Sequence, residues 1–207
     1  MLSSIIFTDP AALAAPSSVF AADLPLRLEI GCGKGDFICG ISEKEPDYNY
    51  IAMEKVDDVI VIAAEKYARL RGLGTLAPNG GFITSDGTLY RDDDHPEFSP
   101  EIAGNVRFLA ADAAILSEAF PSGIFDRIYA NFSDPWTKNG YASRRLTHSG
   151  FLESYERLLR SGGIFAFKTD NDDLFEFSLE SVKASPLSLG YVTYDLHASD
   201  KNENNVM

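Results

Sequence analysis

The sequence has few of the residues that build metal centres and disulfide frameworks. It holds two cysteines and three histidines among 207 residues, and the cysteines, Cys32 and Cys39, are close together in the chain. Two neighbouring cysteines are too few for a disulfide framework, and no group of His and Cys shows the spacing of a zinc site. We therefore expect no structural metal and a reducing, cytoplasmic setting.

Positive charge and long apolar runs are also scarce. The 18 Lys and Arg oppose 31 Asp and Glu, a formal net charge of -13, so a nucleic acid partner would have to meet a local basic patch. No apolar run has the length of a transmembrane helix, and the Ala-rich residues 10–23 lack the preceding cations of a secretory signal. We expect a soluble protein with no membrane partner, as a monomer or a homodimer.

Short apolar runs alternate with longer stretches of helical periodicity, in a chain that is 45% hydrophobic. This pattern is typical of an α/β fold, a mostly parallel sheet with helices on both faces. The length and composition suit a single domain over residues 1–207. The predicted strands are residues 26–31, 48–54, 105–112, 125–132 and 164–170, and the predicted helices are residues 34–45, 56–71, 113–119, 150–160 and 172–183.

Two further segments need separate interpretations. Residues 72–104 lose the periodicity and are rich in Gly, Pro, Thr and Asp, which predicts a surface insertion, with a hairpin at residues 82–90. Residues 190–197 alternate between apolar and polar side chains, as a strand with one wet face does.

A glycine-rich turn follows the first strand, where Gly31, Gly33 and Gly35 let the backbone turn tightly and approach a ligand closely. The dinucleotide fingerprint G-x-G-x-x-G requires glycine at position 36, which is Asp36 here. A pyrophosphate on the following helix is therefore disfavoured, and with it an NAD enzyme.

Acidic residues stand where the first three predicted strands end: Glu29, Glu54 and Asp112. Ligands of open parallel sheets bind outside the carboxyl ends of the strands. A carboxylate at Glu54 can accept both hydroxyls of a ribose, and one at Asp112 can accept from an adenine amine. Three acids around one turn would repel phosphate and attract a cation, which favours S-adenosylmethionine over NAD. The alternative is that these acids are ordinary solvated strand ends.

The fourth strand ends in the stretch Asn-Phe-Ser-Asp-Pro-Trp at residues 131–136. Asn131 joins the candidate cofactor-binding residues. Pro135 restricts Asp134 to extended conformations, which predicts that this acid points into the pocket. Trp136 is open to three interpretations: a lid, a stacking face for a base, or a core residue.

Cations gather just after this stretch, at Lys138, Arg144 and Arg145, with no acid between residues 135 and 152. On an otherwise acidic protein, such a local strip is what contact with phosphate requires.

These motifs resemble the bacterial tRNA (guanine-N7-)-methyltransferase family. The similarity rests on LEIGCGKGDFI, NYIAMEK, AADA, NFSDPWTK, RRLTHSGFLESYERLLRSGG and FKTDNDDLFEFSLE, and covers roughly residues 24–205 apart from the insertion. It implies a Rossmann-like class I fold and transfer of a methyl group from S-adenosylmethionine to a guanine N7 in the variable loop of tRNA. The resemblance implies that Asp134 is the catalytic residue and that the basic segment 140–145 contacts RNA. It also implies that Lys138 and Asp170 bind the substrate. The residues that it implies contact the cofactor are Glu29, Glu54, Asp112 and Asp134.

The sequence departs from the family in two places. The stretch NGYAS thins out the basic segment, which implies weaker tRNA binding. The family continues into a T-x-x-E motif and a final strand, whereas this chain ends at Met207. We therefore expect a truncated gene product with an unpaired edge near Tyr191 to Leu196. Two alternatives stay open: a methyltransferase for another acceptor, and an inactive paralogue that still holds cofactor or RNA.

Overall fold

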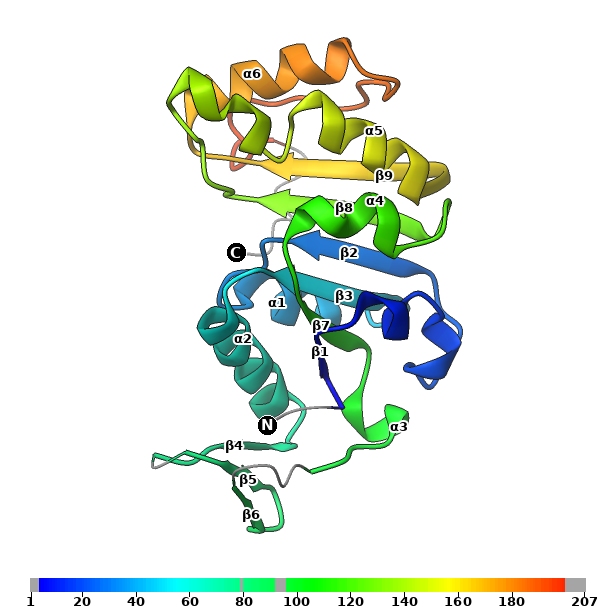
Figure 1. The fold of residues 1–207 in the computed structure, drawn as a ribbon, viewed down its shortest axis with the longest axis vertical. Coiled ribbons are helices and arrows are strands. Elements are labelled where there is room, and N and C mark those ends of the chain that lie inside the picture. The colour runs from blue at the N-terminus through cyan, green and yellow to red at the C-terminus, as the bar shows by residue number, and fades with distance from the viewer. Residues whose placement is uncertain (1–3, 79, 92–95, 200–207) are drawn as a thin grey trace.

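A parallel sheet of six strands forms the centre of the computed structural model, which describes residues 4–78, 80–91 and 96–199. Every neighbouring pair of its strands runs parallel, as Figure 1 shows. In spatial order the strands are β1 (Ile6–Phe7), β7 (Val106–Ala110), β3 (Asn49–Glu54), β2 (Leu26–Ile30), β8 (Phe125–Asn131) and β9 (Leu159–Lys168). Five of these strands overlap the predicted strands, although β9 begins five residues before the predicted strand 164–170, and β1 is an addition that the sequence did not reveal.

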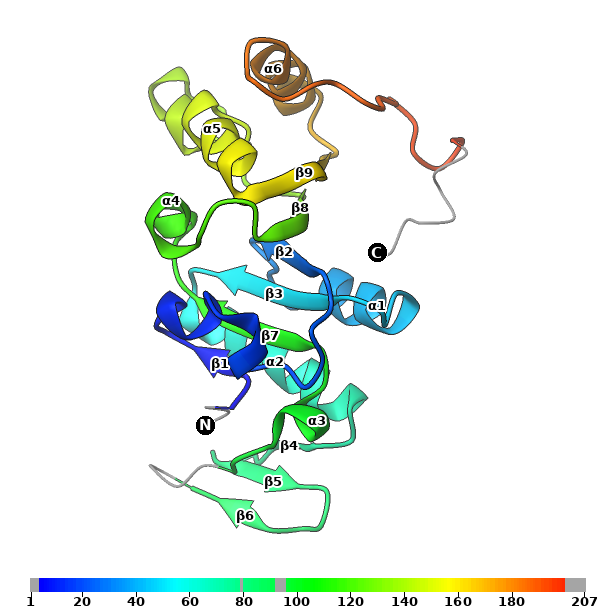
Figure 2. The same cartoon turned by 90° about the vertical axis from the view of Figure 1, so that its right-hand side faces the viewer.

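Helices cover both faces of this sheet, which confirms the predicted fold class (Figure 2). One face carries α1 (Asp36–Lys44) and α2 (Asp57–Leu70), and the other carries α4 (Leu116–Ala119) and α5 (Ser149–Leu158). The short 3-10 helices Pro10–Leu13 and Pro16–Ser18 join the second face, and α6 (Asp172–Lys183) packs beside α5.

The central strands are buried on both faces because each face has its own apolar core. All residues of β2 and β3 are buried. Tyr50 and Ala52 of β3 contribute to the core under α1 and α2, and Ile51 and Met53 to the core on the opposite face. This alternation follows from the two-residue period of a strand. It fixes the register of the sheet and so the positions at which the strands end.

The predicted insertion contains the expected hairpin and one more strand. Strands β4 (Gly74–Leu76), β5 (Phe82–Thr84) and β6 (Leu89–Tyr90) form an antiparallel sheet, at the opposite end of the molecule from α6 (Figure 1). Glu65 of α2 anchors it, because its Oε1 accepts from Thr75 Oγ1 at 2.9 Å and the Leu76 N–H at 3.0 Å. The segment ends in α3 (Pro100–Ala103).

The prediction of a strand at residues 190–197 is wrong, since these residues form turns and irregular backbone. The segment does not pair with the sheet and contacts α6: the Tyr194 ring lies 4.9 Å from that of Phe175, and the Tyr194 hydroxyl donates to Glu176 at 2.8 Å. Strand β9 is therefore the last strand of the sheet among the described residues. In the same part of the chain, no helix is long and apolar enough to cross a membrane.

Candidate active site

A cavity of about 630 Å³ opens at the carboxyl ends of β2, β3, β7 and β8. Parallel strands bring these ends to one edge of the sheet, which is where open α/β sheets bind ligands. Six of the residues predicted from the sequence line the cavity: Gly31, Gly33, Glu54, Asp112, Asp134 and Arg144. The other six, Glu29, Gly35, Asn131, Lys138, Arg145 and Asp170, do not line it.

The glycine turn divides into a part that faces the cavity and a part that faces α2. Gly31 and Gly33 have φ values of +71° and +53°, and a Cβ atom on either would meet no atom within 4 Å. Gly35 has φ +80°, but a Cβ atom there would lie 2.9 Å from the Cβ of Ala63. The first two glycines thus leave open space for a ligand, whereas the third allows α1 and α2 to pack closely.

Glu54 fixes the glycine turn against the end of β3. Its Oε2 accepts from the Gly33 N–H at 3.1 Å, and its Oε1 accepts from the N–H groups of Lys55 and Val56 at 2.9 and 3.1 Å. A carboxylate offers about four acceptor positions. Glu54 therefore keeps acceptor capacity for a ligand while its orientation is set by the backbone.

Asp112 stands at the far side of the cavity, after β7. Its Oδ1 accepts from the Ala114 N–H at 2.9 Å and so caps the 3-10 turn Ala113–Ile115. The side chain is exposed, so the second carboxylate oxygen is free to meet a ligand.

Glu29 is buried beneath the turn and lacks a full set of partners. Only 2% of the residue is exposed. Its Oε1 accepts from Asn131 Nδ2 at 3.2 Å, whereas Glu29 Oε2, Asn131 Oδ1 and Ser133 Oγ are buried without a hydrogen-bond partner among the described residues. All three atoms can accept hydrogen bonds. Buried acceptors without partners suit a ligand that donates hydrogen bonds, such as an ammonium group.

Burial is the main reason that the pKa of Glu29 rises to about 8, and the charges of Asp36 and Glu54 add to it. The hydrogen bond from Asn131 and the charge of Lys168 act in the opposite direction without cancelling the effect. A cation bound here would favour the ionised carboxylate. The residues present therefore fit a positively charged ligand better than a phosphate.

The turn after β8 has an unusual backbone. Phe132 (φ 51°) and Trp136 (φ 43°) are the two non-glycine residues with positive φ in the described part of the chain. Arg145 holds the turn, because its Nε donates to the Pro135 carbonyl at 3.0 Å and its Nη2 to the Trp136 carbonyl at 3.1 Å. Between these residues, Asp134 is exposed and lines the cavity.

Aromatic and cationic side chains surround Trp136. Its ring lies 6.0 Å from that of Tyr141, and the Arg144 guanidinium and the Lys55 ammonium lie 4.9 and 5.7 Å from its centre. Trp136 is half-buried and lines the cavity, so it is a wall of the site and not a core residue.

The cationic strip separates into exposed and inward-turned members. Lys138 and Arg144 are exposed, whereas Arg145 is half-buried and lies 4.3 Å over the ring of Phe177. The geometry gives Arg145 a role in holding the turn. Asp170, which follows β9, is exposed and lies outside the cavity wall.

Sequence reasoning did not single out Phe132, although it lines the cavity with 55% of the residue exposed. A large apolar residue between Asn131 and Ser133 is typical of the last buried position of a strand. The signal that could have identified it is its place directly before Ser-Asp-Pro, where the strand has already ended.

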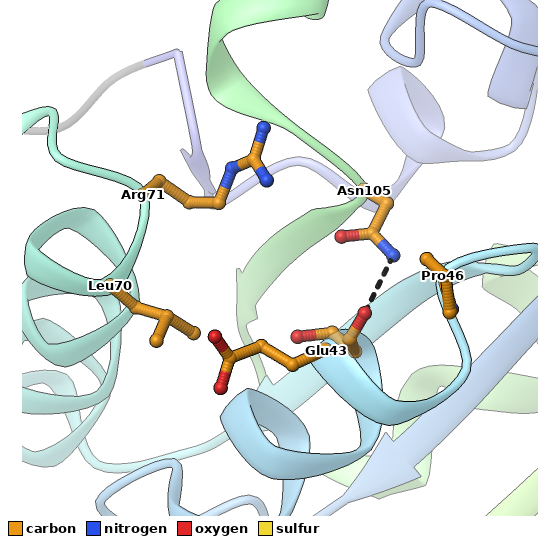
Figure 3. A pocket seen from close by; sticks show the side chains of 6 residues that line it. Glu43, Pro46, Leu70, Arg71 and Asn105 are labelled. Atoms are coloured by element: carbon orange, nitrogen blue, oxygen red, sulfur yellow. Dashed lines mark hydrogen bonds between the residues drawn. The ribbon is translucent and has the colours of Figure 1, made fainter.

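A second hollow, of about 350 Å³, lies between the last turns of α1 and α2 (Figure 3). It is lined by Glu43, Pro46, Leu70, Arg71 and Asn105, together with Ser42. These residues precede β3 and β7 or end the helices, so the hollow lies away from the carboxyl edge of the sheet. The Asn105 amide is already used, because Nδ2 donates to the Ser42 and Tyr48 carbonyls at 3.4 and 3.0 Å. None of the predicted site residues lines this hollow.

Solved structures share the fold at low sequence identity. A precorrin-6Y C5,15-methyltransferase from Geobacter metallireducens superposes with a TM-score of 0.50 and 14% identity over 78% of this chain and 63% of the other. A structure from Thermoplasma acidophilum, described as a putative methyltransferase, gives a TM-score of 0.50 and 16% identity over 88% of this chain and 64% of the other. At this identity the likeness supports the fold alone.

Sequence comparison is more specific. A family described as "Putative methyltransferase" matches residues 23–206. A tRNA (guanine-N(7)-)-methyltransferase of Bacillus subtilis is 39% identical over 191 residues, which cover 92% of this chain and 75% of that protein. The protein of the same name from Bacillus licheniformis is 41% identical over 190 residues, which cover 92% of this chain and 74% of that protein. The family match contains every residue that lines the cavity described above, and the chain belongs to the tRNA (guanine-N(7)-)-methyltransferase family.

Proposed function

We propose that this protein transfers the methyl group of S-adenosylmethionine to N7 of a guanine in the variable loop of tRNA. The main support for this proposal is that Glu54, Asp112 and Asp134 line one cavity. The glycine turn and an exposed cation, Arg144, line the same cavity. Relatives about 40% identical carry this activity in their names. A tRNA substrate also implies a cytoplasmic site of action.

The residues that would hold the methyl donor are those of the glycine turn and the strand ends. Glu54 is placed to accept from ribose hydroxyls, and Asp112 from an adenine amine. Glu29, Asn131 and Ser133 supply buried acceptors for an ammonium group. Acids in this arrangement favour a ligand without phosphates, because a pyrophosphate would be repelled.

The donor would supply a methyl group on a sulfonium, and on transfer the guanine N7 lone pair forms the new bond while the electron pair of the broken bond stays on sulfur. No general base is needed, because N7 carries no proton. The task of the protein is to position the base, and holding reacting groups in line can contribute about 7–11 kcal/mol. The methylated purine is a cation, so a carboxylate near it is stabilising.

Asp134 is the residue placed for this role. It is exposed in the cavity beside the end of β8, where its carboxylate can accept hydrogen bonds from the N1–H and N2–H groups of guanine and stabilise the charge that arrives on the ring. Asp170 would orient the base from the end of β9. The exposed Lys138 and Arg144 would contact the phosphates of the RNA.

The proposal is tested with a tRNA transcript, S-adenosylmethionine and mass spectrometry of the nucleosides. The wild-type protein should form 7-methylguanosine, and a transcript with its variable-loop guanine replaced by adenosine should stay unmodified. Methylation of that control transcript at another position, or no methylation of either, would contradict the assignment.

The role of Asp134 is tested by the substitution Asp134→Asn, which keeps the shape of the side chain and removes its charge. Turnover should fall about a hundredfold or more, the usual loss when one group that stabilises transition-state charge is removed. The affinity for the donor, measured by calorimetry in parallel, separates a catalytic effect from a binding effect. Wild-type turnover in this variant would rule out the proposed role.

A further inference from the structure

Phe132 has a backbone conformation that phenylalanine rarely adopts. Its φ of 51° lies in the left-handed region, which is unfavourable for residues with a Cβ atom. The conformation is held in place, because the Phe132 N–H still donates to the Lys168 carbonyl at 2.8 Å as the last contact between β8 and β9. Such strain persists only where the surroundings impose it, and it concentrates at functional sites.

The side chain of Phe132 is also more exposed than the preceding residues on the same face of β8. Ile128 and Ala130 precede it at two-residue intervals on β8, and both are fully buried. Regular continuation of the strand would direct Phe132 to the same apolar core. Instead, 55% of the residue is exposed at the cavity. Strain and lost burial together indicate that the ring is kept available for a ligand.

Trp136, the other aromatic residue of the turn after β8 that lines the cavity, already contacts other side chains of the protein. The Arg144 and Lys55 cations lie near its ring, and Tyr141 lies against it edge-on. Among the described residues, no ring or cation contact of this kind involves Phe132. Phe132 is thus the ring at the end of β8 that has a face open to solvent.

The position of Phe132 assigns it to the acceptor and not to the donor. Asp112 follows β7 and Phe132 follows β8, and the sheet order β7-β3-β2-β8 places three strand intervals between them, about 14 Å. Asp112 and Glu54 mark the end of the cavity that suits an adenosine. Phe132 lies at the other end, two residues from Asp134.

We propose that the ring of Phe132 stacks on the acceptor guanine and stabilises the positive charge that methylation places on it. This inference rests on the proposed function. Base–aromatic stacking positions the base, and the negative face of an aromatic ring attracts a cation. Because the base is neutral before transfer and cationic after it, the attraction is stronger in the transition state than in the bound substrate, and such interactions accelerate the chemical step.

The test compares Phe132→Leu, which keeps the apolar bulk but has no aromatic face, with Phe132→Tyr, which keeps the face. Steady-state methylation of a tRNA transcript gives kcat/KM for each variant, calorimetry gives donor affinity, and thermal melting verifies the fold. The matched control is Ile102→Ala, a residue of α3 that is also 55% exposed and lies outside both hollows.

For Phe132→Leu, kcat/KM should fall about tenfold to a hundredfold, in line with the loss of one base–aromatic stack. The Tyr variant and the Ile102→Ala control should stay within about threefold of wild type, and donor affinity should be unchanged in all of them. An unchanged kcat/KM in Phe132→Leu would overturn the inference, as would a loss that an equal loss of donor affinity explains. Failure of the wild-type protein to methylate tRNA would instead refute the proposed function.

Discussion

At the scale of single residues, the most unusual group is the buried carboxyl of Glu29. Its acceptors have too few donors, and burial raises its pKa to about 8. A buried carboxyl with a raised pKa is a common feature of functional sites. If the proposed cationic donor binds near it, the ionised form of this carboxyl would be favoured.

This raised pKa predicts how stability without ligand depends on pH. In the unfolded chain Glu29 ionises near the ordinary glutamate pKa of 4.5, whereas burial in the folded protein raises its pKa to about 8. The folded state therefore binds more protons between these values, and its stability falls as pH rises through this window. Between pH 5.5 and 8.5 the contribution of Glu29 should decrease by about 3 kcal/mol at most.

Denaturant unfolding of the wild type and of Glu29→Gln at pH 5.5 and 8.5 measures this contribution. Since glutamine does not titrate, the variant should lose less stability over the interval than the wild type does. Equal losses in both proteins would show that Glu29 ionises normally.

Sequence position alone could indicate which residues lie near one another at the sheet edge, but their roles stay predictions. Glu54, Asp112 and Asp134 line one cavity because parallel strands place their carboxyl ends at one edge. The same reasoning could not identify Phe132, since a positive φ at a non-glycine residue leaves no mark on the apolar pattern. Nor could it show that Arg145 donates to two backbone carbonyls and is thus part of the turn.

At the scale of elements, the contact of α1 with α2 depends on the third glycine of the turn. A methyl group on Gly35 would lie 2.9 Å from the Cβ and 3.1 Å from the Cα of Ala63. Neither atom belongs to a flexible side chain, so the helices would have to move apart. Gly33 offers a matched control, because it has a positive φ as well but open space around it.

The substitution Gly35→Ala should therefore lower the free energy of unfolding by about 2–4 kcal/mol, from backbone strain and overpacking together. Gly33→Ala should lower it by about 1–2 kcal/mol, from strain alone. Urea unfolding monitored by circular dichroism measures both values. A Gly33 variant that is less stable than the Gly35 variant would contradict the packing described for α1 and α2.

Sequence patterns predicted best those strands that pair with neighbouring strands of the central sheet. The alternation at residues 190–197 resembles a strand, but the segment contacts α6, and a strand forms only where another strand pairs with it. The start of β9 was also missed. It begins at Leu159, inside the predicted helix 150–160 and five residues before the predicted strand 164–170, because Leu159 pairs with Phe125 of β8.

At the scale of the whole molecule, the parts with different roles lie apart. The cavity occupies the carboxyl edge of the sheet between β7 and β8, and the β4–β6 sheet lies at the opposite end from α6 (Figure 1). The chain carries a formal charge of -13, yet Arg144 lines the cavity and Lys138 is exposed nearby in the chain. An acidic protein can thus offer a local cationic surface beside an acidic pocket.

We propose that the acids at the carboxyl edge select a cationic methyl donor and hold it beside Asp134. A crystal structure with the bound reaction product S-adenosylhomocysteine tests it most directly. We expect the ligand in the cavity of about 630 Å³, with its ribose hydroxyls on Glu54, its adenine at Asp112 and its sulfur facing Asp134. A ligand bound in the hollow between Glu43 and Arg71, or Asp134 turned away from the ligand, would contradict it.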